Sequence, residues 1–189
     1  MSADFSAART NMVESQVRTQ DVTDLTIQDA MRQVARETLV PVDKAWAAYA
    51  DREVEYAPGR WMLKPRDIAK LLQALRPRVG DTALAIAAPY AAAVMQAMGV
   101  TVTRLDGEDL GAASGSYDLV ICESAVAAAP APWQGALALG GRLGVVERDG
   151  PAGRAVLYLR SEEGVGRRAL FDCGAPYLAG YEPVRGFAF

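Results

Sequence analysis

The chain has 189 residues, of which 51% are hydrophobic and 23% charged, and its formal net charge is -3. This length and composition are typical of one globular domain with a sizeable core. The slight acidic excess argues against a general nucleic-acid-binding protein, which usually carries a basic surplus. We find no apolar run of the roughly 18 residues that span a membrane and no signal-peptide pattern at the N-terminus. We therefore expect a cytoplasmic protein with neither nucleic-acid nor membrane partners.

The absence of histidine and the small number of cysteines restrict the chemistry. The sequence contains no histidine and two cysteines, Cys122 and Cys173. Without histidine, Ser–His and Cys–His nucleophile pairs, histidine general bases and most zinc sites are excluded. The two cysteines form no CxxC motif, so we expect reduced thiols and no metal site.

The first third of the chain has helical patterns. Asp24 can cap a helix over residues 25–34, in which apolar residues recur at i, i+3, i+4 and i+7. A second amphipathic helix is expected over residues 64–75, where Pro65 suits the first turn. The segment between them, residues 48–60, is polar and is predicted to be a connector with a turn.

From residue 82 onward, short apolar strands alternate with helices. The expected strands cover residues 82–88, 100–105, 116–124 and 142–148, and the expected helices cover residues 90–98 and 131–139. The alanine-rich stretch 125–131 is predicted to be a loop or a frayed helix. Two strand-like runs, 154–160 and 167–172, flank a turn and suggest an antiparallel hairpin. This order predicts an α/β sheet, mostly parallel, with an antiparallel edge.

Ligands of such sheets bind beyond the carboxyl ends of the strands, where the strand order reverses. Residues 87–90, 106–109 and 123–126 are expected along that rim. Asp106 could accept a hydrogen bond from a ribose hydroxyl or form an Asp-Gly turn, and the sequence favours the two interpretations equally. Glu123 is expected to be a solvated acid at the strand end, with a cofactor contact as the alternative. Tyr90 lines a pocket or packs in the core or at the rim.

Several long stretches resemble one known family. They are "NMVESQVRTQDVTDLTIQDAMRQVARETLVP", "GRWMLKPRDIAKLLQAL", "YDLVICESAV" and "LALGGRLGVVERDGPAGRAVLYLR". In order and spacing they are similar to the protein-L-isoaspartate O-methyltransferases. The resemblance implies a Rossmann-like methyltransferase sheet with an N-terminal helical cap, and S-adenosylmethionine as the cofactor. It also implies methyl transfer to isoaspartyl carboxylates in proteins or peptides. We expect a single domain over residues 1–189, with a helical segment over residues 1–78 and a trimmed sheet over residues 79–189.

The sequence departs from the family pattern at the sites. The glycine-rich cofactor turn aligns with residues 85–89, where Ala85 replaces an acidic residue and the glycines are missing. Leu63 stands where the family has a serine that helps to hold the substrate. One helix-strand unit of roughly 30 residues is missing after Leu105. Residues 100–105 then match either the second or the third strand of the family, and they should form the new edge of the sheet.

Two functions remain open from the sequence. One is an S-adenosylmethionine-dependent isoaspartyl methyltransferase of a shortened type, and the other is an inactive methyltransferase-like interaction or scaffold protein. No catalytic residue is assigned, and no oligomeric state is predicted. The candidate cofactor-binding residues are Ala87, Pro89, Tyr90, Asp106 and Glu123. Because the glycines of the turn are absent, we expect weak or absent binding of S-adenosylmethionine.

Overall fold

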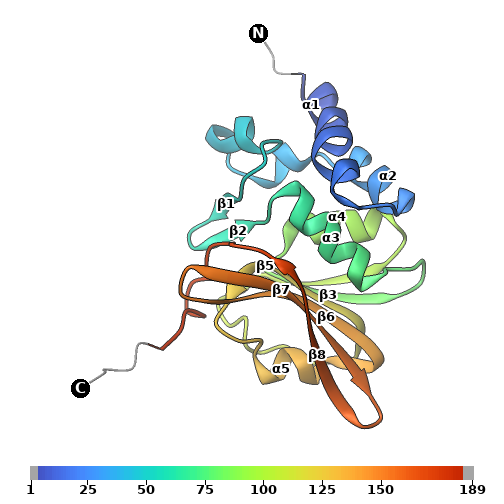
Figure 1. The fold of residues 1–189 in the computed structure, drawn as a ribbon, viewed down its shortest axis with the longest axis vertical. Helices are drawn as coiled ribbons and strands as arrows, with labels where there is room; N and C mark the ends of the chain where they lie inside the picture. The colour runs from blue at the N-terminus through green and yellow to red at the C-terminus, as the bar shows by residue number, and fades with distance from the viewer. Residues whose placement is uncertain (1–3, 185–189) are drawn as a thin grey trace.

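A computed structural model describes residues 4–184 and has one large sheet at its centre (Figure 1). Its strands are β3 (Thr82–Ile86), β4 (Thr101–Leu105), β5 (Tyr117–Val126), β6 (Leu137–Asp149), β7 (Ala152–Ser161) and β8 (Gly164–Asp172). Their order is β4-β3-β5-β6-β7-β8. The pairs from β4 to β6 are parallel, and the last two pairs are antiparallel. This confirms the predicted α/β fold with its antiparallel hairpin.

Helices cover both faces of the sheet. They are α3 (Pro65–Leu75) and α4 (Pro89–Ala97) on one face and α5 (Ala131–Gly135) on the other (Figure 1). Successive side chains of a strand point to opposite faces. Accordingly, Ala83 and Ala85 join the core cluster on the α3–α4 side, whereas Leu84 and Ile86 join the cluster around Trp133 of α5. The near-continuous apolar run of β3 thus reflects a strand that is covered on both sides.

The N-terminal segment forms a third layer outside α3 and α4 (Figure 1). It contains α1 (Phe5–Met12), a π-helical stretch (Val13–Val17), α2 (Leu25–Gln33) and three 3₁₀ turns (Arg18–Gln20, Arg36–Leu39 and Val42–Ala47). The Asp24 carboxylate caps α2 by accepting hydrogen bonds from the N–H groups of Thr26 and Ile27. The predicted helical cap is therefore present, and it rests on the two sheet-facing helices. No helix in the described range 4–184 is long and apolar enough to cross a membrane.

The predicted polar connector over residues 48–60 is wrong in part. It contains β1 (Val54–Ala57), which pairs antiparallel with β2 (Arg60–Met62). Gly59 adopts a φ of +66°, and a Cβ there would lie 2.5 Å from the Cβ of Ala179. Glycine therefore makes the turn and also admits the C-terminal segment, whose Ala179 N–H bonds the Gly59 carbonyl at 3.0 Å. Strands β1 and β2 have only four and three residues, so the alternation of apolar and polar residues in them cannot be told apart from a polar loop.

The region between β5 and β6 also differs from the prediction. Strand β5 continues to Val126, and α5 ends at Gly135, so neither the loop over 125–131 nor the helix over 131–139 is correct as predicted. The Ala136 carbonyl accepts a hydrogen bond from Tyr117 N–H at 2.9 Å, and Leu137 pairs with Tyr117. Strand β6 thus begins to pair with β5 at Leu137, within the segment that the local sequence predicts as helix. Tertiary hydrogen bonds outweigh helix propensity here.

Strand β4 lies at the edge of the sheet, as expected from the missing unit. It pairs in parallel with β3, with Ile86 opposite Leu105. In a doubly wound sheet of order 3-2-1-4-5-6, the second strand lies directly beside the first, which is β3 here. By position, β4 therefore occupies the place of the second strand.

Candidate functional site

The carboxyl ends of β3, β4 and β5 meet at one edge of the sheet. Ile86 pairs with both Leu105 of β4 and Cys122 of β5. The next residue along each strand is Ala87, Asp106 or Glu123, so these three predicted site residues come together. The strand order reverses between β3 and β5, which is where an open α/β sheet binds its ligand. The predicted rim is therefore formed.

The turn from β3 into α4 keeps a glycine-like backbone without a glycine. Ala87 is fully buried and has a φ of +44°, a left-handed conformation that L side chains rarely adopt. Its N–H donates to the Leu105 carbonyl at 3.0 Å. Pro89 is the first residue of α4, and proline has no N–H to offer a ligand. The turn therefore holds its shape through chain contacts, and the methyl group of Ala87 fills space that a glycine would leave open.

Glu123 corrects the expectation of a solvated acid, because its side chain is fully buried. Its Oε1 accepts a hydrogen bond from Ala91 N–H in the first turn of α4 at 2.6 Å, and its Oε2 accepts one from Leu63 N–H at 3.3 Å. The first N–H groups of a helix have no partner within the helix and attract anions. Glu123 thus places the protein's own carboxyl group at the N-terminus of α4.

Arg36 is the charged partner of this region, and the sequence analysis did not identify it. It is fully buried, and its Nε and Nη2 donate to the carbonyls of Ala48 at 2.7 Å and Leu63 at 2.5 Å. Its guanidinium lies over the ring of Tyr90, 4.4 Å from the centroid. Tyr90 is consequently a core residue beneath Arg36 and does not line the rim. No local sequence signal marks Arg36, since its partners come from distant segments.

Burial determines the pKa values of Glu123, Tyr90 and Arg36. It raises the pKa of Glu123 to about 7, an effect that the positive charge of Arg36 and the backbone N–H donors only partly oppose. Burial also raises the pKa of Tyr90 and lowers that of Arg36. Near neutral pH, the Glu123 carboxyl is therefore close to half protonated. In either form, its oxygen can accept the hydrogen bond from Ala91 N–H.

Asp106 lies at the end of β4 and is partly engaged. Its Oδ2 forms an ion pair with Arg104 Nε at 2.8 Å. Its Oδ1 is buried and has no hydrogen-bond partner among the described residues. A buried acceptor without a partner is costly, so Oδ1 is suited to a hydroxyl donor such as a ribose hydroxyl. This is the position from which an acidic residue binds ribose in dinucleotide-binding sheets.

Two chain segments cover the rim. From the β1–β2 hairpin, Arg60 donates to the carbonyls of Asp106 at 2.5 Å and Gly107 at 2.7 Å. In the same hairpin, Trp61 N–H donates to Ser124 Oγ at 3.1 Å. From the C-terminal segment, the N–H of Leu178 donates to the carbonyl of Ala125 at 2.7 Å. The hairpin that the sequence analysis missed thus bridges the ends of β4 and β5.

The described residues hold no group of three or more carboxylate or thiol side chains that could bind a metal. Cys122 and Cys173 are free and buried, and burial raises the pKa of Cys122 to about 12. A thiol in this state is not a nucleophile. The candidate site therefore consists of hydrogen-bonding groups, and Asp106 Oδ1 is the carboxylate oxygen among them that has no partner within the described residues.

Comparison with known proteins gives the family. No family model matches the sequence. The chain is 30% identical to a protein-L-isoaspartate O-methyltransferase of Methylorubrum populi, in an alignment that covers 81% of this chain and 85% of that protein. It is 26% identical to one from Koribacter versatilis, with 96% of each chain covered. That alignment runs over 214 positions, more than the 189 residues of this chain, so the relative has segments without a counterpart here.

A solved structure shows the same fold. It is described as a putative protein-L-isoaspartate O-methyltransferase from Plasmodium falciparum in complex with S-adenosyl-L-homocysteine. It superposes with a TM-score of 0.74 at 15% identity, over 90% of this chain and 97% of that one. The Methylorubrum protein is matched over most of its length at 30% identity, and the fold agrees with that of the solved structure. The chain belongs to the protein-L-isoaspartate O-methyltransferase family.

Proposed function

We propose that this family member does not bind S-adenosylmethionine tightly and acts as a methyltransferase-like interaction protein. The observation that carries the proposal is the hydrogen bond from Ala91 N–H to Glu123 Oε1 at 2.6 Å. S-adenosylmethionine carries a carboxylate, and helix N-terminal N–H groups are the natural place for it in this fold. In this protein the buried carboxyl group of Glu123 already takes that place.

At the turn, the residues of this chain do not fit the cofactor. The methyl group of Ala87 occupies the close-approach position, and Pro89 supplies no N–H. Ala85 has no polar group to offer within β3. Each hydrogen bond lost to a charged ligand group weakens binding by about 1.5–3 kcal/mol. Two such losses would move a micromolar site to a Kd between roughly 0.2 and 20 mM.

A second candidate function is methyl transfer from S-adenosylmethionine to isoaspartyl carboxylates. The specific observation in its favour is Asp106 Oδ1, a buried acceptor without a partner at the ribose-binding position. The absence of histidine does not oppose it, because the accepting carboxylate is already ionised at neutral pH. Isoaspartyl proteins or peptides would then be the partners. This function requires Glu123 to release Ala91 N–H.

A thermal shift with S-adenosylmethionine distinguishes the two functions. A ligand at 100 times its Kd adds about 2.7 kcal/mol of stability, which raises the melting temperature of a chain this size by roughly 5–10 °C. We expect no shift for the natural protein at millimolar cofactor. A shift of that size, or methyl transfer to an isoaspartyl peptide, would overturn the proposal.

Rebuilding the turn tests the physical reason. In the variant Ala85→Asp/Ala87→Gly/Pro89→Gly, we expect a measurable gain in cofactor affinity. Adding Asp106→Ala should abolish the gain, because the ribose then loses its acceptor. Titration calorimetry gives both affinities. If the rebuilt variant gains nothing, the turn is not the decisive loss, and Glu123 or the missing helix-strand unit must account for it.

A further inference from the structure

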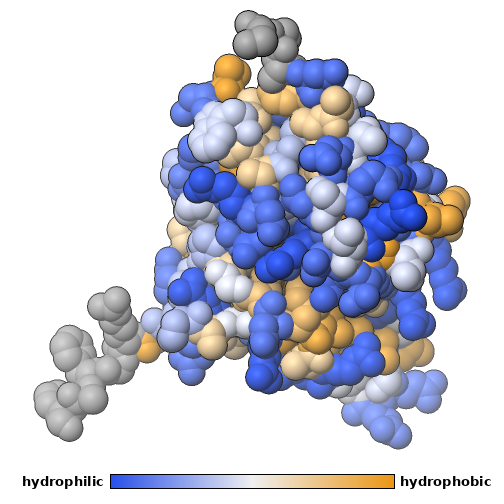
Figure 2. Space-filling view, turned by 45° about the horizontal axis from the view of Figure 1, so that its top comes forward, coloured by the Kyte–Doolittle hydropathy of each residue, from blue (hydrophilic) through white to orange (hydrophobic). Residues whose placement is uncertain are grey.

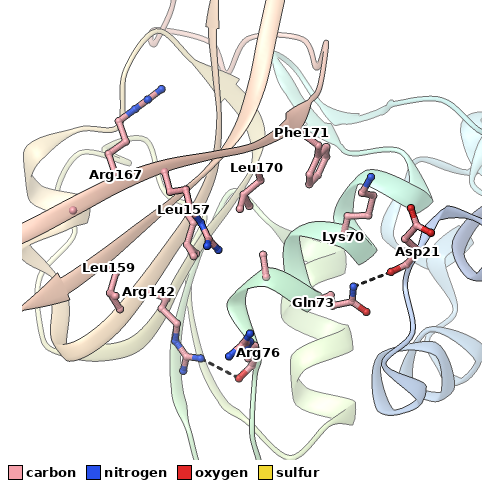
Figure 3. Close-up of a pocket in the computed structure, with 13 residues that line it drawn as sticks. Asp21, Lys70, Gln73, Arg76, Arg142, Leu157, Leu159, Arg167, Leu170 and Phe171 are labelled. Carbon is pink, nitrogen blue, oxygen red and sulfur yellow. Dashed lines mark hydrogen bonds between the residues drawn. The ribbon is translucent and has the colours of Figure 1, made fainter.

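A groove with a volume of about 920 Å³ lies between α3 and the β7–β8 hairpin (Figure 3). It includes none of the residues of the candidate site. The residues that line it are Asp21, Lys70, Gln73, Ala74, Arg76, Arg142, Leu157, Leu159, Gly166, Arg167, Arg168, Leu170 and Phe171. The groove lies along the C-terminal half of α3. The contact between Leu63 and Glu123 lies at the other end of this helix, before its N-terminus. It is a separate surface from the rim.

One wall of the groove is apolar. Strands β7 and β8 contribute Leu157, Leu159, Leu170 and Phe171, and Leu159 is 47% exposed. Figure 2 shows hydrophobic side chains on the lower part of the visible face, with hydrophilic ones around them. Helix α3 covers only part of this face of the hairpin (Figure 1). An apolar strand face with a polar border is the usual form of an interaction surface.

The border is basic, although the protein as a whole is acidic. Five of the lining side chains are lysine or arginine and one is aspartate, whereas the whole chain has 20 basic and 23 acidic residues. Arg167 points away from the groove in Figure 3 and pairs with Glu147 on the other face of the sheet. Arg168 pairs with Leu157 in the sheet register and therefore lies on the groove side.

Three of the five basic groups of the groove have no acidic partner among the described residues. Among residues 4–184, no carboxylate lies within ion-pair distance of Lys70, Arg76 or Arg168. Arg142 has one long acidic contact, with Asp81 at 3.8 Å, and donates to the Arg76 carbonyl at 3.3 Å, while its Nε is buried without a hydrogen-bond partner. Lys70 lies over the ring of Phe171 at 4.7 Å, which joins the cationic and apolar parts of the groove.

We propose that this groove binds an extended acidic segment of a partner protein in which apolar and acidic residues alternate. Apolar side chains of the segment would contact the leucines of β7 and β8, and its carboxylates would face Lys70, Arg76 and Arg168. A symmetric dimer through this groove fits less well, because two basic grooves repel each other. A small ligand fits less well too, since exposed Leu159 and Arg168 leave the groove open. The inference does not depend on the state of the cofactor site.

Fluorescence anisotropy with a labelled peptide tests this inference. The probe is a decapeptide in which glutamate alternates with leucine. One matched peptide carries lysine in place of every glutamate, and the other carries serine in place of every leucine. We expect saturable binding of the glutamate-leucine peptide alone, which weakens as salt is added. The variant Arg168→Glu should weaken it about tenfold, equal to about 1.4 kcal/mol. The control Arg52→Glu reverses the charge of an arginine that is also exposed but lies outside the groove, and it should leave the affinity unchanged.

Each other result would overturn the proposal. No binding of the glutamate-leucine peptide, or equal loss of affinity in both variants, would exclude a specific acidic-segment site. Laurate that displaces the peptide and binds more tightly would assign the groove to an anionic amphiphile. A concentration-dependent dimer in sedimentation, dissociated by Arg168→Glu, would assign it to a second copy. Circular dichroism melts of both variants verify that the fold is retained.

Discussion

Arg36→Met is expected to lower the free energy of unfolding by about 3–5 kcal/mol, since two buried carbonyls lose their hydrogen-bond donors, at about 1–3 kcal/mol each, and the packing of the side chain is lost as well. The substitution removes the donors to the Ala48 and Leu63 carbonyls and the positive charge that opposes the burial of Glu123. It also removes the cation from the ring of Tyr90. Urea denaturation near neutral pH measures the change.

The exposed Arg52 provides the control, and Arg52→Met should change stability by less than about 0.5 kcal/mol. A double-mutant cycle separates the charge interaction from the loss of packing. Combined with Glu123→Gln, Arg36→Met should cost less than the sum of the two single changes, because the buried charge that it would strand is gone. A loss below about 1 kcal/mol for Arg36→Met would contradict a structural role for the buried guanidinium.

The second large effect is a dependence of stability on pH that comes from Glu123. Its pKa is about 7 in the folded protein and 4.5 for an ordinary glutamate, so the folded state binds this proton more tightly. The resulting stability is fully present below about pH 4.5 and is lost as the pH rises through 7. The total change is about 3 kcal/mol.

The matched variant Glu123→Gln keeps the shape of the side chain and cannot titrate. Between pH 5 and pH 8, the natural protein should lose about 2.5 kcal/mol of stability relative to this variant. Urea denaturation at several pH values gives the difference between the two proteins. If the natural protein instead gained stability relative to Glu123→Gln as the pH rose, the folded-state pKa of Glu123 would be lowered, and burial would not be the dominant influence.

The sheet was predictable because its strands carry strong local patterns. The apolar runs around Ala85 and Ile121 predicted two adjacent covered strands, and the structure pairs them directly. The rim followed from the topology, which placed Ala87, Asp106 and Glu123 together. Pattern analysis worked here because period and strand order determine which ends of strands meet.

The buried network was not predictable, because it depends on contacts between distant segments. Arg36 bonds residues that lie 12 and 27 positions away, and Glu123 bonds Leu63, 60 positions away. Glu123 ends the apolar run in the sequence, where a glutamate is ordinarily solvated, but β5 continues to Val126 and nothing local marks this glutamate as buried. The β1–β2 hairpin escaped for a similar reason, since its strands are short and are stabilised by the C-terminal segment around Ala179.

The amide of Ala91 provides the most direct test of the closed cofactor site. In ¹H–¹⁵N spectra, this amide should titrate with an apparent pKa near 7, because its hydrogen-bond acceptor is Glu123. Addition of S-adenosylhomocysteine to millimolar concentration should leave the amides of Ala87, Ala88 and Ala91 unchanged. Saturable shifts of these three amides on addition of the ligand would show that it reaches the N-terminus of α4, and would contradict a site closed by Glu123.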